Sequence, residues 1–158
     1  RTTGTFAIPA LVLDVGTRLA LGLGSAGLAM LAYMSEAECE AVIQRCAAEY
    51  KKHDISADTV RNSVKRARSL GYSFQEGRLT REIAGLSVLL VDDHGIAAAI
   101  SLTALSQRLR PVRRRQIVSI IRDACAGVPG VRVYPSVLPQ ERESRRTATR
   151  AKPRKSSM

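Results

Sequence analysis

The chain has 158 residues, of which 45% are hydrophobic and 25% are charged, and its formal net charge is +11. This length and composition are typical of a single folded domain with a core, and they exclude a chain that is disordered throughout. The longest uncharged run, residues 19–35, is diluted by glycines and serines, so a loop followed by a helix explains it better than a membrane span. The three cysteines form no C-x-x-C pair, which favours free, buried thiols and a reducing, cytoplasmic setting.

The first part of the chain is expected to contain a strand, a glycine loop and a helix. Residues 5–13, TFAIPALVL, are apolar and β-branched enough for a strand, which Pro9 pushes toward an edge or a bulge. The stretch GLGSAG, residues 22–27, comes after a short apolar run. The sequence SAGLAMLAYM predicts a buried helix over about residues 25–34.

Two further helices are predicted from the signals at their ends. Ser35 and Glu38 form a capping box, in which the serine side chain accepts the N3 amide and the glutamate reaches back. Another helix is expected over residues 57–70, with Ser56 as its N-cap and Gly71 as its stop. Its inward face is expected to hold Val60, Val64, Ala67 and Leu70.

The second half of the chain changes from helical spacing to strands. YSFQEG at residues 72–77 alternates, whereas residues 83–91 and 96–105 are nearly continuous apolar strands. The cluster DDHG at residues 92–95 is turn chemistry, so these two strands should form an antiparallel hairpin. A last helix is expected over residues 112–126, with a buried stripe of Ile117, Ile120, Ile121 and Ala124. The order of elements predicts an α+β fold, an antiparallel sheet with helices packed on it.

The chain also carries two basic segments. Residues 135–158 hold seven basic and two acidic side chains and end in SRRTATRAKPRKSSM, which is too polar to fold. We therefore expect a domain over residues 1–134 and a disordered basic tail over residues 135–158. Five arginines lie in residues 108–115. Such segments contact nucleic acid or an anionic surface, are simply solvated, or form salt bridges with a neighbouring domain.

The stretch GLGSAG matches the dinucleotide-binding pattern G-x-G-x-x-G, but its context does not. A Rossmann unit needs a second parallel strand with an acid at its end about 20 residues later. Here that position falls inside the capped helix, so a dinucleotide site is excluded, and no Gly-Lys-Ser/Thr follows for a phosphate loop. The remaining alternatives are a helix N-terminus whose free amides bind a small anion, or a tight turn that lets the helix pack.

No catalytic or metal-binding set stands out from the sequence. His94 lies in the DDHG turn, and the only other histidine is His53, so a turn explains it better than a metal site. Ser101 and Thr103 are two residues apart on an apolar strand, so both hydroxyls point to one face. Such hydroxyls either hydrogen-bond across the sheet or line a pocket and bind ligand oxygens.

Three blocks of the sequence together resemble a known family. They are VGTRLALGLGSAGLAMLAYMSEAE, VRNSVKRARSLGYSFQEG and IAGLSVLLVDDHGIAAAISLTALSQRL, and they occur in the right order. The more specific parts are the R-x-x-G-Y element from Arg68 to Tyr72 and the D-x-x-G…AAISLTALSQRL block. Over about residues 4–126 the chain is similar to the C-terminal effector-binding domain of IclR-type bacterial transcriptional regulators.

This resemblance implies a GAF-like fold whose pocket lies on one face of the antiparallel sheet. The pocket positions that it carries over are Ser25, Ala26, Gln75, Gly85, Ser101 and Thr103. Family members often have an acid where Gln75 stands, and Gly85 replaces a side chain sometimes used for contact, which would leave more room.

The expected function is therefore that of a ligand-sensing, non-enzymatic domain without a cofactor. It would bind a small organic or aromatic acid and so modulate the binding of operator DNA. The DNA would be bound by an N-terminal winged helix-turn-helix that is not part of this sequence. The regulator is expected to be a homodimer or homotetramer in the cytoplasm. The chain begins at Arg1, which indicates a fragment or a processed chain, and the first strands of the sheet are expected to be missing. The alternative is a basic nucleic-acid-associated protein that acts through its arginine-rich segments and tail.

Overall fold

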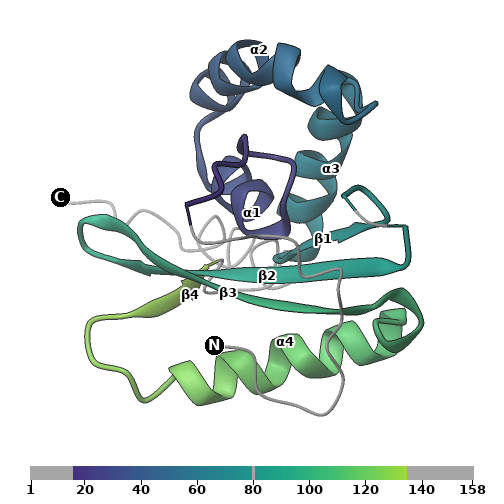
Figure 1. The fold of residues 1–158 in the computed structure, drawn as a ribbon. Helices are drawn as coiled ribbons and strands as arrows, with labels where there is room; N and C mark the ends of the chain where they lie inside the picture. Colours follow the sequence, from purple (N-terminus) through teal and green to yellow (C-terminus); the bar gives the residue numbers. More distant parts are fainter. Residues whose placement is uncertain (1–15, 80, 135–158) are drawn as a thin grey trace, which may run out of the picture.

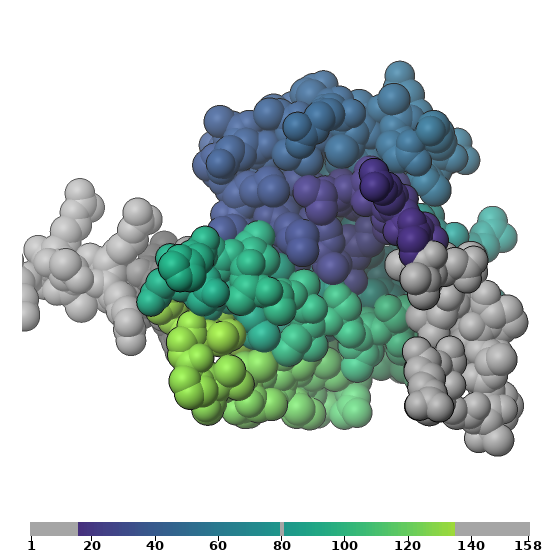
Figure 2. Space-filling view, turned by 60° about the vertical axis from the view of Figure 1, so that its left-hand side comes forward, coloured from purple at the N-terminus to yellow at the C-terminus, as the bar shows by residue number. Residues whose placement is uncertain are grey.

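The computed structural model describes residues 16–79 and 81–134. In this part the elements follow in the order α1 (Ser25–Tyr33), α2 (Glu36–Lys52), α3 (Ala57–Leu70), β1 (Ser73–Glu76), β2 (Ile83–Asp92), β3 (Gly95–Leu105), a 3-10 turn (Ser106–Arg108), α4 (Pro111–Cys125) and β4 (Arg132–Tyr134). Helices α1, α2 and α3 lie over one face of the sheet and α4 runs along the other face (Figure 1). The space-filling view shows the same layers, with α4 beneath the sheet (Figure 2).

The sheet is antiparallel and is built around β2. Strand β3 pairs with β2 along its whole length, in a register that places Ser87 opposite Ser101 and Gly85 opposite Thr103. Strands β1 and β4 also pair with β2, at residues 84–87 and 89–91 respectively, so they share its other edge end to end. The architecture is the mixed α+β fold with an antiparallel sheet that the sequence predicts. The expected strand at residues 5–13 and the expected tail at 135–158 lie outside the described residues.

The helix ends confirm the capping signals. Ser35 accepts a hydrogen bond from the amide of Glu38 at 3.3 Å, and the amide of Ser35 donates back to the Glu38 carboxylate at 3.1 Å. Ser56 accepts from the Thr59 amide at 3.1 Å. Gly71 ends α3 with a φ of 76°, the left-handed conformation that favours glycine at this position. The hairpin between β2 and β3 is also confirmed.

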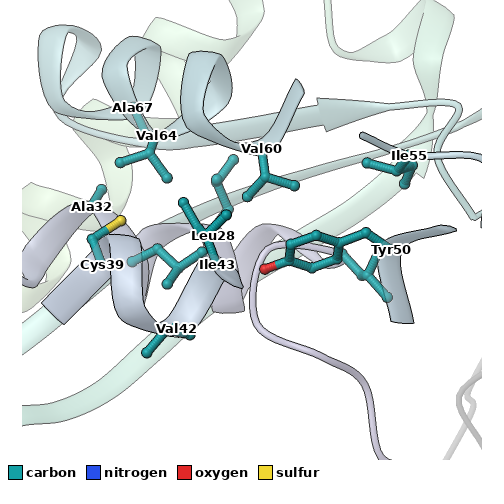
Figure 3. Packing of buried hydrophobic residues seen from close by; sticks show 12 residues of the cluster. Leu28, Ala32, Cys39, Val42, Ile43, Tyr50, Ile55, Val60, Val64 and Ala67 are labelled. Carbon is teal, nitrogen blue, oxygen red and sulfur yellow. The ribbon is translucent and has the colours of Figure 1, made fainter. Parts of the chain in front are cut away.

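Two separate hydrophobic clusters hold the sheet between its helices. The first lies among α1, α2 and α3, where Leu28, Leu31 and Tyr50 are fully buried (Figure 3). Cys39 belongs to this cluster and Cys46 packs against it, so both behave as the small hydrophobic residues that the sequence predicts. The second cluster lies between the sheet and α4, and its fully buried centre includes Leu86, Val88 and Leu109.

Three details of the sequence prediction are wrong. Leu70, which was expected on the inward face of α3, is exposed at the end of that helix. On α4, Ile120 and Ala124 face solvent. Val118 and Cys125 are buried in their place. Contact with the sheet decides which side chains of α4 are buried, so the buried face of α4 is rotated about the helix axis from the stripe that the spacing predicts. Strand β4 was not expected at all, since three residues are too few to show alternation. No helix in the described part of the chain is long and apolar enough to cross a membrane.

Candidate functional site

The glycine-rich loop ends at the N-terminus of α1, which lies over the middle of the sheet. Gly24 is the N-cap, and no side chain caps this helix end. The first amides of an α-helix have no acceptor within the helix, and the helix dipole places partial positive charge there. The amides that begin with Ser25 and Ala26 are therefore donors at a positively polarised point.

Tyr50 fixes the loop from the helical layer. Its hydroxyl donates to the Leu21 carbonyl at 2.6 Å, and Figure 3 shows the ring of Tyr50 beside Ile43 and Val60. Burial raises the pKa of the Tyr50 hydroxyl, which keeps it a donor. Gly22 is required next to this contact: its φ is +99°, and a Cβ here would lie 2.8 Å from Val60 Cγ1.

Gln75 and Arg78 hold the loop from the side of the sheet. The Gln75 side-chain amide donates to the Gly22 carbonyl at 2.6 Å, and Arg78 Nη1 donates to the same oxygen at 3.1 Å. Arg78 also donates to Ser63 on α3. Burial lowers the pKa of Arg78. The loop geometry thus depends on side chains from α2, β1 and the turn after β1.

A cluster of serine hydroxyls connects α1 to the sheet. Ser87 Oγ donates to Ser25 Oγ at 2.8 Å, and Ser87 and Ser101 share a hydrogen bond of 2.6 Å. Ser73 donates to the Ser25 carbonyl at 2.6 Å. If Ser101 donates to Ser87 and Ser87 to Ser25, the hydroxyl proton of Ser25 remains available to a ligand. The helix amides and the Ser25 hydroxyl then present donors, which suits an anion, while the proton of Ser101 is used in its bond to Ser87.

Gly85 and Thr103 complete this part of the sheet. A Cβ at Gly85 would lie 2.8 Å from Ser25 Oγ and 3.2 Å from Ser25 Cβ, so glycine lets α1 approach β2. The extra room that we expected at Gly85 is therefore filled by Ser25. Thr103 lies opposite Gly85 on β3, and its side chain is exposed on the same face.

The six residues expected at a pocket are thus brought together at the N-terminus of α1. Ser25, Ala26, Ser101 and Thr103 surround the helix end, whereas Gln75 holds the loop and Gly85 holds the helix. The sequence reasoning missed the serines of the adjoining strands. Ser87 carried a usable signal, because it lies two residues after Gly85 and so shares its face.

The turn at residues 92–95 is not part of this candidate site. The His94 amide donates to the Asp92 carboxylate at 2.7 Å, an Asx-type turn, and this confirms that the turn chemistry explains the histidine. Within residues 16–79 and 81–134 no group of three or more histidine, cysteine, aspartate or glutamate side chains is placed to hold a metal ion.

The comparison with protein families gives a match over most of the chain. The model described as the C-terminal part of the bacterial transcriptional regulator IclR matches residues 6–128. The fold is therefore that of a regulator's C-terminal domain. The chain belongs to the IclR family, whose members are transcription regulators and not enzymes. No curated protein sequence matches the chain.

Solved structures of the family have the same fold. IclR of Thermotoga maritima is 17% identical with a TM-score of 0.64, over 77% of this chain and 50% of that one. An IclR-family regulator from Rhodococcus is 27% identical with a TM-score of 0.56, over 74% of this chain and 45% of that one. The C-terminal domain of Escherichia coli KdgR is 18% identical with a TM-score of 0.58, over 67% of this chain and 66% of that one. The chain spans about half the length of the two longer proteins.

Proposed function

We propose that this chain is the effector-sensing part of a DNA-binding regulator and that it binds a small organic or aromatic acid at the N-terminus of α1. One observation carries the proposal: the uncapped amides of Ser25 and Ala26 lie beside a chain of hydroxyls in which Ser25 accepts from Ser87 and keeps its own proton for a ligand. A carboxylate satisfies these donors, and the helix dipole adds a favourable charge interaction of about 0.3–1 kcal/mol.

The six residues have different parts in this proposal. Ser25, Ala26 and Thr103 contact the ligand, the first two through the helix end and the last through its hydroxyl on β3. Ser101 acts by donating to Ser87, which fixes the direction of the hydroxyl chain and leaves the Ser25 proton to the ligand. Gln75 acts indirectly, because its side-chain amide already donates to the Gly22 carbonyl and fixes the loop. Gly85 acts by letting Ser25 lie against β2.

Isothermal calorimetry on the intact protein tests the proposal with a panel of acids, including acetate, lactate and benzoate. We expect saturable binding of at least one acid and no binding of the matching amide. Removing the β3 hydroxyls by Ser101→Ala with Thr103→Ala is expected to weaken binding at least tenfold, since one lost hydrogen bond to a charged group costs about 1.5–3 kcal/mol.

The matched control is Ser69→Ala, which removes an exposed hydroxyl on α3, away from the site. It should leave the affinity unchanged. Unchanged affinity in the Ser101 and Thr103 double variant would show that the pocket assignment is wrong.

The signal to DNA is part of the same proposal. The ligand must bind one arrangement of a homodimer or homotetramer better than another for operator binding to change. The alternative, a basic protein that binds nucleic acid through its arginine-rich segments and tail, predicts DNA affinity that falls steeply with salt and disappears when residues 140–158 are deleted. Operator affinity that responds to an acid and survives this deletion favours the sensor.

A further inference from the structure

A cavity lies at the opposite end of α1 from the candidate site. It forms where β1 and β4 meet along the edge of β2: β1 pairs up to Ser87 and β4 begins at Leu89, so the backbone at Val88 lies at the junction. The cavity has a volume of about 270 Å³, and the C-terminal turns of α1 and α3 also line it. Pockets for drug-sized ligands measure about 300–1,000 Å³, so this cavity suits a one-ring molecule.

Three tyrosines lie in the wall of this cavity, among alanines, serines and a glycine. Tyr33 and Tyr134 line it together with Met34 and Leu89, and Tyr72 lies at its edge while also packing against the cluster beneath the sheet. Tyr33 and Tyr134 form an edge-to-face pair with ring centroids 4.9 Å apart and planes at 83°. A third aromatic ring can pack on such a pair edge-on or in an offset stack, which is the geometry that ring quadrupoles favour.

Arg68 supplies the charge of the cavity. Its Nε donates to the Ala32 carbonyl at 3.1 Å and its Nη2 to the Met34 carbonyl at 2.8 Å, so the guanidinium holds the end of α1. Nη1 lies 3.9 Å from the carboxylate of Glu36, whose side chain is 95% exposed. Among the described residues that line the cavity there is no carboxylate, and Arg68 is the one permanently charged side chain.

From this arrangement we infer a second small-molecule site, which takes a small aromatic carboxylic acid. The ring packs against the tyrosines, and the carboxylate accepts from Arg68 Nη1. The carbonyls at the end of α1 would repel an anion, and the guanidinium offsets them, so acid binding depends on Arg68. This site is separate from the one at Ser25, although Ser73 and Ser87 take part in the hydroxyl cluster and also line the cavity.

The tyrosines themselves give the most direct test. The chain has four tyrosines and no tryptophan. Three of them line the cavity, whereas Tyr50 contacts the glycine loop through its hydroxyl. Benzoate is titrated into the intact protein carrying ¹³C-labelled tyrosine, with each ring signal assigned by a Tyr→Phe variant. We expect saturable shifts of the Tyr33, Tyr72 and Tyr134 signals.

A matched pair of variants and a neutral analogue sharpen the result. Ala29→Leu fills the cavity from α1, and Ala124→Leu adds the same side chain at an exposed position on α4. We expect the first to weaken benzoate binding at least tenfold and the second to leave it unchanged. Benzamide, which lacks the charge, should bind wild-type protein at least tenfold more weakly than benzoate.

Three results would overturn the inference. One is the absence of saturable shifts in the three cavity tyrosines. Another is a shift confined to Tyr50, which would place benzoate at the candidate site and leave that proposal standing. The last is equal binding of benzamide and benzoate, and this comparison needs no variant to fold.

Discussion

The two faces of the same sheet differ in chemistry. Toward α4 the alternate residues of β1, β2 and β3 are apolar, and they include Phe74, Ala84, Leu86, Val88, Ile100 and Leu102. Toward α1, the neighbouring positions are small or polar: Ser73, Gln75, Gly85, Ser87, Ser101 and Thr103. Burial of the first set stabilises the fold, while the second set contributes hydrogen bonds and close backbone approach.

Residues that stabilise the fold and residues that adjoin the candidate site therefore alternate along a single strand. Strand β2 sends Leu86 and Val88 into the α4 core and Gly85 and Ser87 toward α1, because successive side chains point to opposite faces. Substitutions on the α4 face should therefore affect folding, and those on the α1 face should affect binding more than folding.

The largest expected effect is the loss of Leu86. This side chain is fully buried beneath α4, and Leu86→Ala should reduce the free energy of unfolding by about 2–5 kcal/mol through the lost burial and the cavity left behind. Ser87→Ala, one residue along on the other face, should cost only about 1 kcal/mol. Urea unfolding followed by circular dichroism measures both. Equal losses would break the proposed division between the two faces.

A methyl group at Gly85 should have the next largest effect. Its Cβ would lie 2.8 Å from Ser25 Oγ, so Gly85→Ala must push α1 away from β2. We expect a loss of about 1–3 kcal/mol in stability together with weaker acid binding. Gly127→Ala is the control, since nothing lies within 4 Å of a Cβ there. If Gly85→Ala bound acids as well as the wild type, the contact between α1 and β2 would not shape the site.

Tyr50→Phe should have a smaller effect of a different kind. It removes the hydrogen bond to the Leu21 carbonyl and leaves the ring packed, so stability should fall by about 1 kcal/mol. Because the loop loses one of its supports, acid affinity should fall as well. Thermal unfolding and calorimetry on the same sample report both quantities, and a loss of stability without any change in affinity would separate the loop from the site.

The smallest effect is expected at the ion pair between α2 and α3. Arg61 donates to both carboxylate oxygens of Glu40, at 2.8 and 2.6 Å. Hydrogen bonds from Arg61, and then from Gln44, lower the pKa of Glu40 from its usual 4.5 to about 2. The pair therefore stabilises the fold above pH 4.5, and this contribution is lost as the pH falls toward 2.

Glu40→Gln checks this pH dependence. Melting temperatures measured between pH 2 and pH 6 should show a weaker dependence on pH in the variant than in the wild type. Acid binding at the helix end should not change, because Glu40 belongs to the helical layer and contacts Arg61 and Gln44. Identical pH profiles would show that the exposed pair is screened by solvent.

Local signals in the sequence were enough to predict most of the elements. The caps at Ser35 and Ser56, the stop at Gly71 and the turn at residues 92–95 each act over a few residues, so the sequence shows them directly. Strand β4 and the rotation of α4 depend on contacts with β2 and the sheet, which arise only when distant segments pack.

For the candidate site, too, the sequence predicts the local features and not the contacts between distant segments. The spacing of Ser101 and Thr103 placed both on one face, but the partner of Ser101 is Ser87, which only the register of the hairpin brings opposite it. The supports of the loop are more remote still: Tyr50 and Arg78 lie in other elements, and their hydrogen bonds to backbone carbonyls leave no pattern in the sequence.

The central claim is that the amides at the start of α1 bind a carboxylate. It is tested most directly by ¹H–¹⁵N spectra of the intact protein during titration with acetate, lactate and benzoate, each paired with its amide. The account predicts saturable shifts at Ser25 and Ala26 with at least one acid and none with its amide. Two results would contradict it. One is that the tested acids bind saturably but none of them shifts the Ser25 and Ala26 signals, and the other is that no tested acid binds at all.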